Sequence, residues 1–333
     1  MDASVLHREA ACDASNSAVA NLLGATTLGL VLAAAARQLG RAGRGRQVEP
    51  EPEPAGPAWR EARALHAAAA LLGGSVLVDS AMEHYRGSFE NPGMVAPLLA
   101  SLMTVLAGAS GMAPAVGRPR LAQRGIFTTA LATGAAGFGF HLYNVGRRPG
   151  RWCWQNLFYA APVGAPAALS LAGLLGLAAQ RMRFAAAGAA PSLLGLDAGR
   201  ALSAVTGLGI AGAATEAGLL HFRGAFQNPC MFLPVTVPPM TAALMLHAAA
   251  RPSASRPRLV RGWLLITGAL GLAGVGFHAY GVSRQMGGWH NASQNLLSGP
   301  PLSAPPSFAA LALAGWAALS LLIRSGRKTG AQQ

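Results

Sequence analysis

Four histidines occur as two pairs with a constant spacing. His84 and His221 open the phrases HYRGSFENPGM and HFRGAFQNPCM, and their offset is 221 − 84 = 137. His141 and His278 lie in GFGFHLY and GVGFHAY, where 278 − 141 = 137 again. Imidazole is a ligand for copper, iron and zinc, and two histidines on facing helices can bracket a haem. The repeated spacing therefore predicts a duplicated metal or haem site.

Further side chains recur at the same offset and enlarge the predicted site. In each copy one carboxylate stands five residues before the first histidine. Each copy also contains a methionine in the motif, whose thioether sulfur is a suitable ligand for Cu(I). The predicted metal ligands are His84, His141, His221, His278, Asp79, Glu216, Met94 and Met231. The groups predicted to hold a haem propionate or another part of a ligand are Arg86, Arg223, Asn91, Asn228, Tyr143, Tyr280, Gln155 and Gln294.

The same residues also have a purely structural explanation, which the sequence leaves open. Asn-Pro is a good helix start, because Asn caps the helix and Pro takes its first position. Arg-Gly fits a tight turn, and the Gly137-x-Gly139 and Gly274-x-Gly276 pairs fit close helix packing as well as the approach of a flat cofactor. Trp152 fits an aromatic belt at a membrane interface.

The composition indicates the elements that must position these residues. Of the 333 residues 52% are hydrophobic and only 11% are charged, whereas a soluble domain carries about 25% charged residues. Several charge-free runs are about 20 residues long, enough to cross a bilayer. We expect an all-α, polytopic helical membrane protein in contact with the lipid bilayer. The net charge of +14 comes from arginines in short loops, so a nucleic-acid partner is not expected.

Nine transmembrane helices are predicted. The first spans 17–36 and is followed by arginines and a Pro/Glu linker. The others form two sets of four, at 62–83, 94–114, 125–146 and 160–180, and at 201–220, 232–250, 260–282 and 304–323. The chain divides accordingly into an N-terminal part (1–61), a first four-helix repeat (62–198) and a second repeat with a short basic tail (199–333).

The arginine distribution predicts the orientation. Loops rich in arginine alternate along the chain with loops that contain a single arginine. One loop of the second kind is an exception, because it contains Arg147, Arg148 and Arg151. By the positive-inside rule the N-terminus lies outside and the C-terminus in the cytoplasm. Four spans per repeat make both repeats parallel, related by a pseudo-twofold axis along the membrane normal, with both motifs at the outer face. The nearly lysine-free composition suggests a bacterial inner membrane.

The three cysteines, Cys12, Cys153 and Cys230, show no zinc-binding spacing. All three are predicted on the outer side. A Cys153–Cys230 disulfide and unpaired thiols both remain open.

Three functions compete at this point. The first is a redox or metal-handling membrane protein that binds haem or copper. The second is a carrier or channel for a small, anionic solute, with the amides Gln155, Asn156, Gln294 and Asn295 in an outer vestibule; the inner ends of the spans carry no repeated polar path, which counts against it. The third is a membrane scaffold or assembly factor with an unidentified protein partner. Whether the protein is an enzyme stays open.

Overall fold

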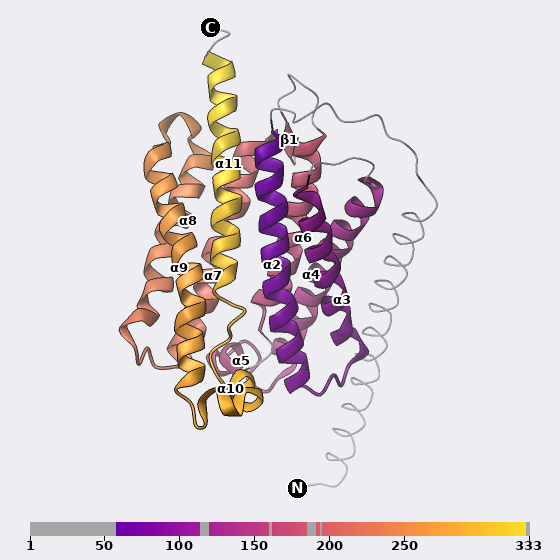
Figure 1. Cartoon of the computed structure of the whole chain (residues 1–333), viewed down its shortest axis with the longest axis vertical. Coiled ribbons are helices and arrows are strands. Elements are labelled where there is room, and N and C mark those ends of the chain that lie inside the picture. The colour runs from indigo at the N-terminus through magenta and orange to yellow at the C-terminus, as the bar shows by residue number, and fades with distance from the viewer. Residues whose placement is uncertain (1–57, 114–119, 160–161, 185–190, 194, 331–333) are drawn as a thin grey trace.

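The computed structural model describes residues 58–113, 120–159, 162–184, 191–193 and 195–330. Almost all of these residues are helical, and they form two four-helix bundles side by side (Figure 1). The first bundle consists of α2 (Trp59–Arg86), α3 (Ala96–Gly111), α4 (Arg120–Arg147) and α6 (Gly164–Arg183). The second bundle consists of α7 (Ala198–Arg223), α8 (Leu233–Ala250), α9 (Pro257–Ser283) and α11 (Pro306–Gly330).

Short elements connect these helices. The 3-10 turns η1 (Pro92–Val95), η2 (Pro229–Phe232), η3 (Pro252–Ala254) and η4 (Gly288–Asn291) precede α3, α8, α9 and α10. The helices α5 (Trp154–Tyr159) and α10 (Ala292–Ser298) precede α6 and α11. A two-stranded antiparallel hairpin, β1 (Ser192–Leu193) and β2 (Leu196–Asp197), joins the bundles, with Ser192 opposite Asp197.

The predicted spans agree with the observed helices. Each of the eight spans predicted between 62 and 323 overlaps one long helix. Within the described ranges, six helical segments are long and apolar enough to cross a membrane: Trp59–Arg86, Pro92–Gly111, Ala198–Arg223, Pro229–Ala250, Pro257–Ser283 and Pro306–Gly326. The predicted spans 125–146 and 160–180 lie in α4 and α6, which are helical but are not among these six. The span 17–36 and Cys12 lie outside the described residues.

Each bundle has the same packing order. Helices α2 and α4 face each other diagonally, because each packs between α3 and α6; in the second bundle α7 and α9 each pack between α8 and α11. Small residues permit close approach: a Cβ on Gly173 of α6 would lie only 2.5 Å from the Phe127 carbonyl oxygen of α4. Such packing by small residues is typical of membrane helices.

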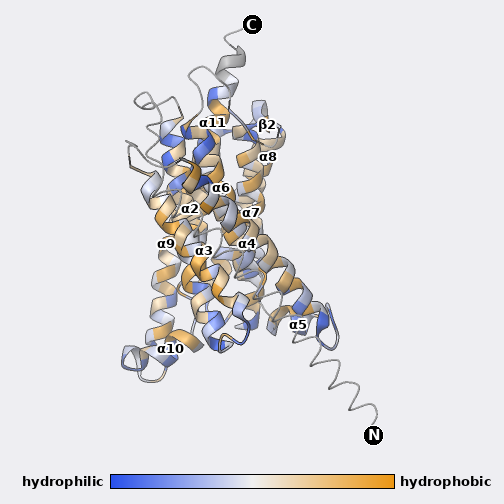
Figure 2. Ribbon diagram, turned by 90° about the vertical axis from the view of Figure 1, so that its right-hand side faces the viewer, coloured by the Kyte–Doolittle hydropathy of each residue, from blue (hydrophilic) through white to orange (hydrophobic). Residues whose placement is uncertain are grey.

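The two ends of the molecule differ in content. Helices α5 and α10 lie at one end, here called the motif end, and the strands β1 and β2 at the other, here called the hairpin end (Figure 1). Hydrophilic residues gather toward both ends, and hydrophobic residues fill the length between them (Figure 2). At the hairpin end an ion pair of 2.7 Å between Arg324 and the buried Glu61 joins α11 to α2.

Candidate functional site

The H-[YF]-R-G-x-F motif ends a helix and makes the same turn in both bundles. After α2 the chain passes through two left-handed residues, Ser88 (φ 54°) and Phe89 (φ 50°). After α7 it does the same at Ala225 (φ 57°) and Phe226 (φ 46°). Non-glycine residues rarely adopt this conformation. The same turn forms in both copies with phenylalanine at its second left-handed position, although the residue at the first position is serine in one copy and alanine in the other.

The Asn-Pro step that follows starts the next helical segment, as the structural explanation predicted. The side-chain oxygen of Asn91 accepts from the backbone N–H of Gly93 at 2.8 Å. The side-chain oxygen of Asn228 accepts from the backbone N–H of Cys230 at 2.9 Å. The role of both asparagines as caps is therefore confirmed. Their predicted role in holding a ligand stays a prediction.

The first histidine of each copy is anchored across this turn. The Nδ1 atom of His84 lies 2.7 Å from the carbonyl oxygen of Met94, and the Nδ1 atom of His221 lies 2.8 Å from that of Met231. Phe89 and Phe226 pack edge-on against these rings, with centroids 6.2 Å apart in both copies. The left-handed turn thus fixes the imidazole from two sides. Sequence analysis missed this role of the phenylalanines, although both recur five residues after the histidine.

The second histidine of each copy is anchored in the same manner to the segment before the fourth helix. The Nδ1 atom of His141 contacts the Pro162 carbonyl oxygen, and that of His278 lies 2.6 Å from the Pro301 carbonyl oxygen. All four rings are half-buried. In every case a carbonyl oxygen engages Nδ1.

The four histidines come together as two pairs, one in each bundle. The ring centroids of His221 and His278 lie 6.4 Å apart, and their planes meet at 63°. His84, near the end of α2, and His141, near the end of α4, occupy the equivalent positions of the first bundle. Each pair joins two diagonal helices across the core of its own bundle. The sequence predicted that all four rings lie at a common depth. In the structure two of the rings belong to the first bundle and two to the second.

The two carboxylates reach across to the opposite bundle. Asp79 of α2 accepts from the hydroxyl of Ser303, just before α11, at 3.2 Å. Glu216 of α7 accepts from the backbone N–H of Gly164, at the start of α6, at 3.2 Å. Both carboxylates are therefore interbundle contacts. Their predicted role as metal ligands stays a prediction. In the described ranges, no group of three or more His, Cys, Asp and Glu side chains is placed to hold a metal ion.

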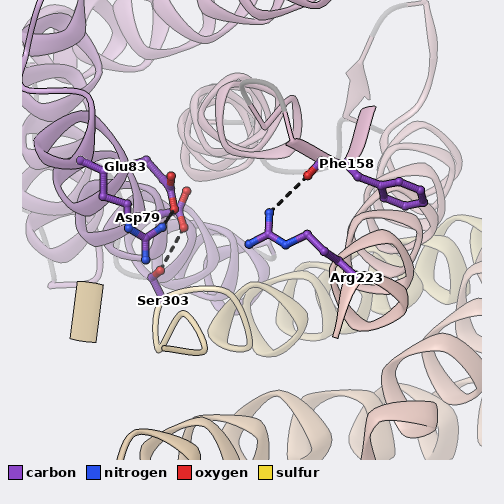
Figure 3. A network of polar contacts seen from close by, with 6 residues as sticks. Asp79, Glu83, Phe158, Arg223 and Ser303 are labelled. Carbon is purple, nitrogen blue, oxygen red and sulfur yellow. Dashed lines mark hydrogen bonds and ion pairs between the residues drawn. The ribbon is translucent and has the colours of Figure 1, made fainter. Parts of the chain in front are cut away.

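The two motif arginines take different partners; Figure 3 shows Arg223 directed toward Phe158, apart from Asp79 and Glu83. Arg86 forms an ion pair with Glu83, one turn earlier on α2. Arg223 donates to the carbonyl oxygen of Phe158 in α5 at 3.2 Å. Both guanidinium groups are exposed, so each can still meet an anionic group from solvent or from a bound ligand.

The predicted aromatic and sulfur groups lie beside this core. Tyr143 and Tyr280 are exposed. The guanidinium of Arg147 lies over the Tyr143 ring and that of Arg284 over the Tyr280 ring. Arg284 also donates to the Tyr280 hydroxyl at 3.0 Å. The terminal methyl groups of Met94 and Met231 pack over the turn glycines, which favours a packing role for these side chains.

The predicted amides divide by function. Asn156 donates to the carbonyl oxygens of Pro149 and Arg151, and Asn295 to those of Met286 and Gly288. Both asparagines are buried, whereas Gln155 and Gln294 are exposed. The asparagines therefore hold the loops before α5 and α10 in shape. Cys153 and Cys230 are not bonded to each other; both thiols are free.

The glycine pairs have split roles. Gly137 and Gly274 pack against prolines of the fourth helix of each bundle: a Cβ there would lie 3.3 Å from Pro166 and 2.7 Å from Pro305. Close packing therefore explains the first glycine of each pair. The second glycines, at 139 and 276, have no other atom within 4 Å of that position, so space remains beside the helix one turn or less from each anchored histidine.

One buried histidine was undervalued from sequence. His66 of α2 is fully buried, neither ring nitrogen has a hydrogen-bond partner, and its ring centroid lies 5.7 Å from that of Phe127. Ser203 stands at the matching position of the second copy, so the repeat does not mark this histidine. Its burial in the hairpin half of the first bundle separates it from the motif histidines.

Comparison of the chain with family models, with curated proteins and with solved structures gave no match.

Proposed function

We propose that this protein is a membrane redox protein in which each bundle binds one haem between two axial histidines, His84 with His141 and His221 with His278. The paired, carbonyl-anchored imidazoles on diagonal helices carry the proposal.

The carbonyl contacts select one tautomer of each ring. A carbonyl oxygen only accepts hydrogen bonds, so the Nδ1 atom that faces it carries the proton. The neutral ring then presents an unprotonated Nε2 with a free lone pair. Histidines that bind metals are oriented in this way by a second hydrogen bond to a carbonyl or carboxylate. Four such anchors at four matched positions favour ligation over simple packing.

The spacing of the rings suits a single metal between them. A metal–nitrogen bond of about 2 Å and about 1 Å from the nitrogen to the ring centre give roughly 6 Å between two opposed imidazole centroids. His221 and His278 are separated by 6.4 Å. Diagonal helices provide the necessary gap, because they do not have to pack directly against each other.

The number of ligands favours haem over a bare ion. A structural zinc site takes four protein ligands, and within the described residues no set of three or more His, Cys, Asp and Glu ligands is found. Haem brings its own four nitrogens, and the protein supplies only axial ligands. Arg86 and Arg223 are exposed at the same end of the molecule and would meet the propionates of the haem.

The test is an absorption spectrum and metal analysis of the protein purified in detergent. We expect about two haem irons per chain, about one after His278→Ala, and none after His84→Ala is combined with His278→Ala, since each centre loses an axial ligand. Added haem together with imidazole should restore the second low-spin centre of the single variant. The matched controls are His247→Ala and His290→Ala, two exposed histidines outside the pairs.

The outcomes separate the alternatives. A colourless, metal-free protein whose properties are the same in all His→Ala variants would remove the proposal. Copper in place of iron, with the same dependence on the four histidines, would keep the paired sites and replace the haem. Metal content that is unchanged by the variants would place the metal elsewhere.

The proposal includes the topology. Nine crossings, counting the span 17–36, put the N-terminus outside and the C-terminus in the cytoplasm, with the two bundles related by a pseudo-twofold axis along the membrane normal. Free Cys153 at the motif end offers a direct test. In a chain without the other cysteines, a membrane-impermeant thiol reagent should label Cys153 in intact cells. A cysteine at Ser192 in the hairpin, in a chain without native cysteines, should be labelled only after lysis.

A further inference from the structure

Three arginines at the motif end break the charge asymmetry of the chain. Arg147 ends α4, and Arg148 and Arg151 follow in the loop before α5. At the matching positions of the second copy, 284, 285 and 288, stand Arg, Gln and Gly. The second bundle thus makes the corresponding loop with one arginine. The additional positive charge is therefore not needed to form the loop.

The backbone at Arg151 strengthens this point. Both loops pass through two left-handed residues: Gly150 (φ 81°) and Arg151 (φ 46°) in the first, Gly287 (φ 77°) and Gly288 (φ 52°) in the second. Glycine adopts this conformation without steric cost, whereas a residue with a Cβ does not. The first copy keeps an arginine where glycine would be the easier choice. Strained positions of this kind concentrate at functional sites.

Two open surface depressions adjoin this cluster and share Arg147. One, of about 370 Å³, is lined by Leu142, Tyr143, Gly146, Arg147 and Trp152. The other, of about 390 Å³, is lined by Asn144, Arg147, Arg148 and Pro149. The first is largely aromatic and aliphatic, and the second is cationic and polar. Their shared wall suits a ligand with an apolar part and an anionic part.

Among the described residues, no acidic side chain forms an ion pair with an arginine of this cluster. The two ion pairs found among the described residues, Arg86 with Glu83 and Arg324 with Glu61, lie outside it. Arg148 donates one N–H to the Tyr159 carbonyl oxygen at 3.3 Å, and the Arg147 guanidinium lies 5.6 Å from the Tyr143 ring centroid. Each guanidinium has five N–H donors, so donors remain for an anion.

We propose that Arg147 and Arg148 bind the phosphate of an amphipathic molecule whose apolar part lies against Tyr143 and Trp152. Arginine binds phosphate through two parallel hydrogen bonds. Tryptophan and tyrosine are enriched at the depth of lipid headgroups. The cluster lies at the C-terminal end of α4, which crosses the membrane in the proposed topology. The phosphate therefore comes from an anionic phospholipid or from a soluble phosphate compound, and the experiment distinguishes these sources.

The experiment measures phosphatidylglycerol bound per chain by native mass spectrometry of the full-length protein in an uncharged detergent. We expect one tightly held lipid on the wild type and about 25-fold weaker binding in the Arg147→Gln/Arg148→Gln double variant, roughly fivefold for each guanidinium removed. Arg284→Gln, the matching change in the second bundle, should retain the lipid. Higher salt should weaken binding, since these side chains are exposed.

Separate titrations use phosphatidylcholine and inorganic phosphate. Weak binding of phosphatidylcholine and of inorganic phosphate would support the proposal, because the site requires both net negative charge and an apolar body. Equal retention in the double variant and the wild type, or equal binding of phosphatidylcholine, would overturn it. Tight binding of inorganic phosphate without lipid would overturn the amphipathic assignment. The single variant Arg148→Gln repeats the measurement if the double variant does not fold.

Discussion

The two bundles hold their histidines alike but contact each other differently. In both, Nδ1 of each histidine faces a carbonyl oxygen and a left-handed turn presses a phenylalanine against the first ring. In contrast, Arg86 pairs within its own helix, while Arg223 reaches α5 of the other bundle. The geometry around the imidazoles is therefore the same in both copies, whereas the contacts between the bundles differ.

The carboxylate contacts show how such divergence can be compensated. Ser303 and Gly164 occupy matching positions, each two residues before the proline that packs on the glycine pair. The shorter Asp79 meets a hydroxyl on Ser303, and the longer Glu216 meets the backbone N–H of Gly164. A longer acid thus faces a residue without a side chain, and a shorter acid faces one with a donor. Each carboxylate keeps a hydrogen bond in an interior where an unpaired charge is costly.

The largest expected effect comes from placing a side chain at Gly164. Its Cβ would overlap the Glu216 carboxylate, so Gly164→Ser should push the carboxylate away from the Gly164 backbone N–H to which it is bonded. A buried charged group that loses its hydrogen bond should lower the free energy of unfolding by about 2–4 kcal/mol. Adding Glu216→Asp should recover most of this loss, because the pair then reproduces Asp79 with Ser303. The measurement is thermal unfolding of the wild type and of these two variants in detergent. If the double variant is no more stable than Gly164→Ser, the two contacts are not interchangeable.

A smaller effect, equal in both bundles, is expected at the loop asparagines. Asn156 makes bonds of 3.0 and 2.7 Å to two carbonyl oxygens, and Asn295 makes bonds of 3.1 and 2.8 Å. Asn→Ala at either position leaves two acceptors without a donor and should cost about 1–3 kcal/mol of stability. The exposed Gln155→Ala and Gln294→Ala serve as controls and should be nearly neutral. Unequal losses at the two asparagines would show that the loops differ in stability despite equal hydrogen bonding.

Much of the helical layout was predictable because apolar runs of sufficient length can only be helices in a membrane. The runs at 201–220 and 260–282, for example, lie within α7 and α9. The repeat also located the motif residues, since a fixed offset of 137 marks equivalent positions. Helices α5 and α10 were not predicted, because their few residues carry no periodic apolar signal and their prolines suggested irregular backbone.

The partners of the site residues could not be predicted for a different reason. The groups that fix the histidines are backbone carbonyls, at Met94 and Pro162 for example, and every residue type has one. The division into two pairs depends on which helices are diagonal, which is a property of packing. The crossing of Asp79 and Glu216 to the opposite bundle likewise depends on how the bundles meet. Sequence placed these side chains at one level but could not assign their neighbours.

The smallest effect should come from changing the residue three positions before the motif arginine, which differs between the two copies. Glu83, three residues before Arg86, is matched by Leu220 before Arg223. Leu220→Glu offers Arg223 a partner within its own helix and should draw it away from the Phe158 carbonyl oxygen. A partly exposed i,i+3 pair contributes only about 0.2–0.5 kcal/mol, so total stability should change little.

The interaction of Arg223 with α5 should change most, and a double-mutant cycle isolates it: Arg223→Ala should destabilise the wild type more than the Leu220→Glu variant. Equal losses would mean that the Phe158 contact contributes nothing between the bundles, and that the divergence of the two arginines has no energetic consequence.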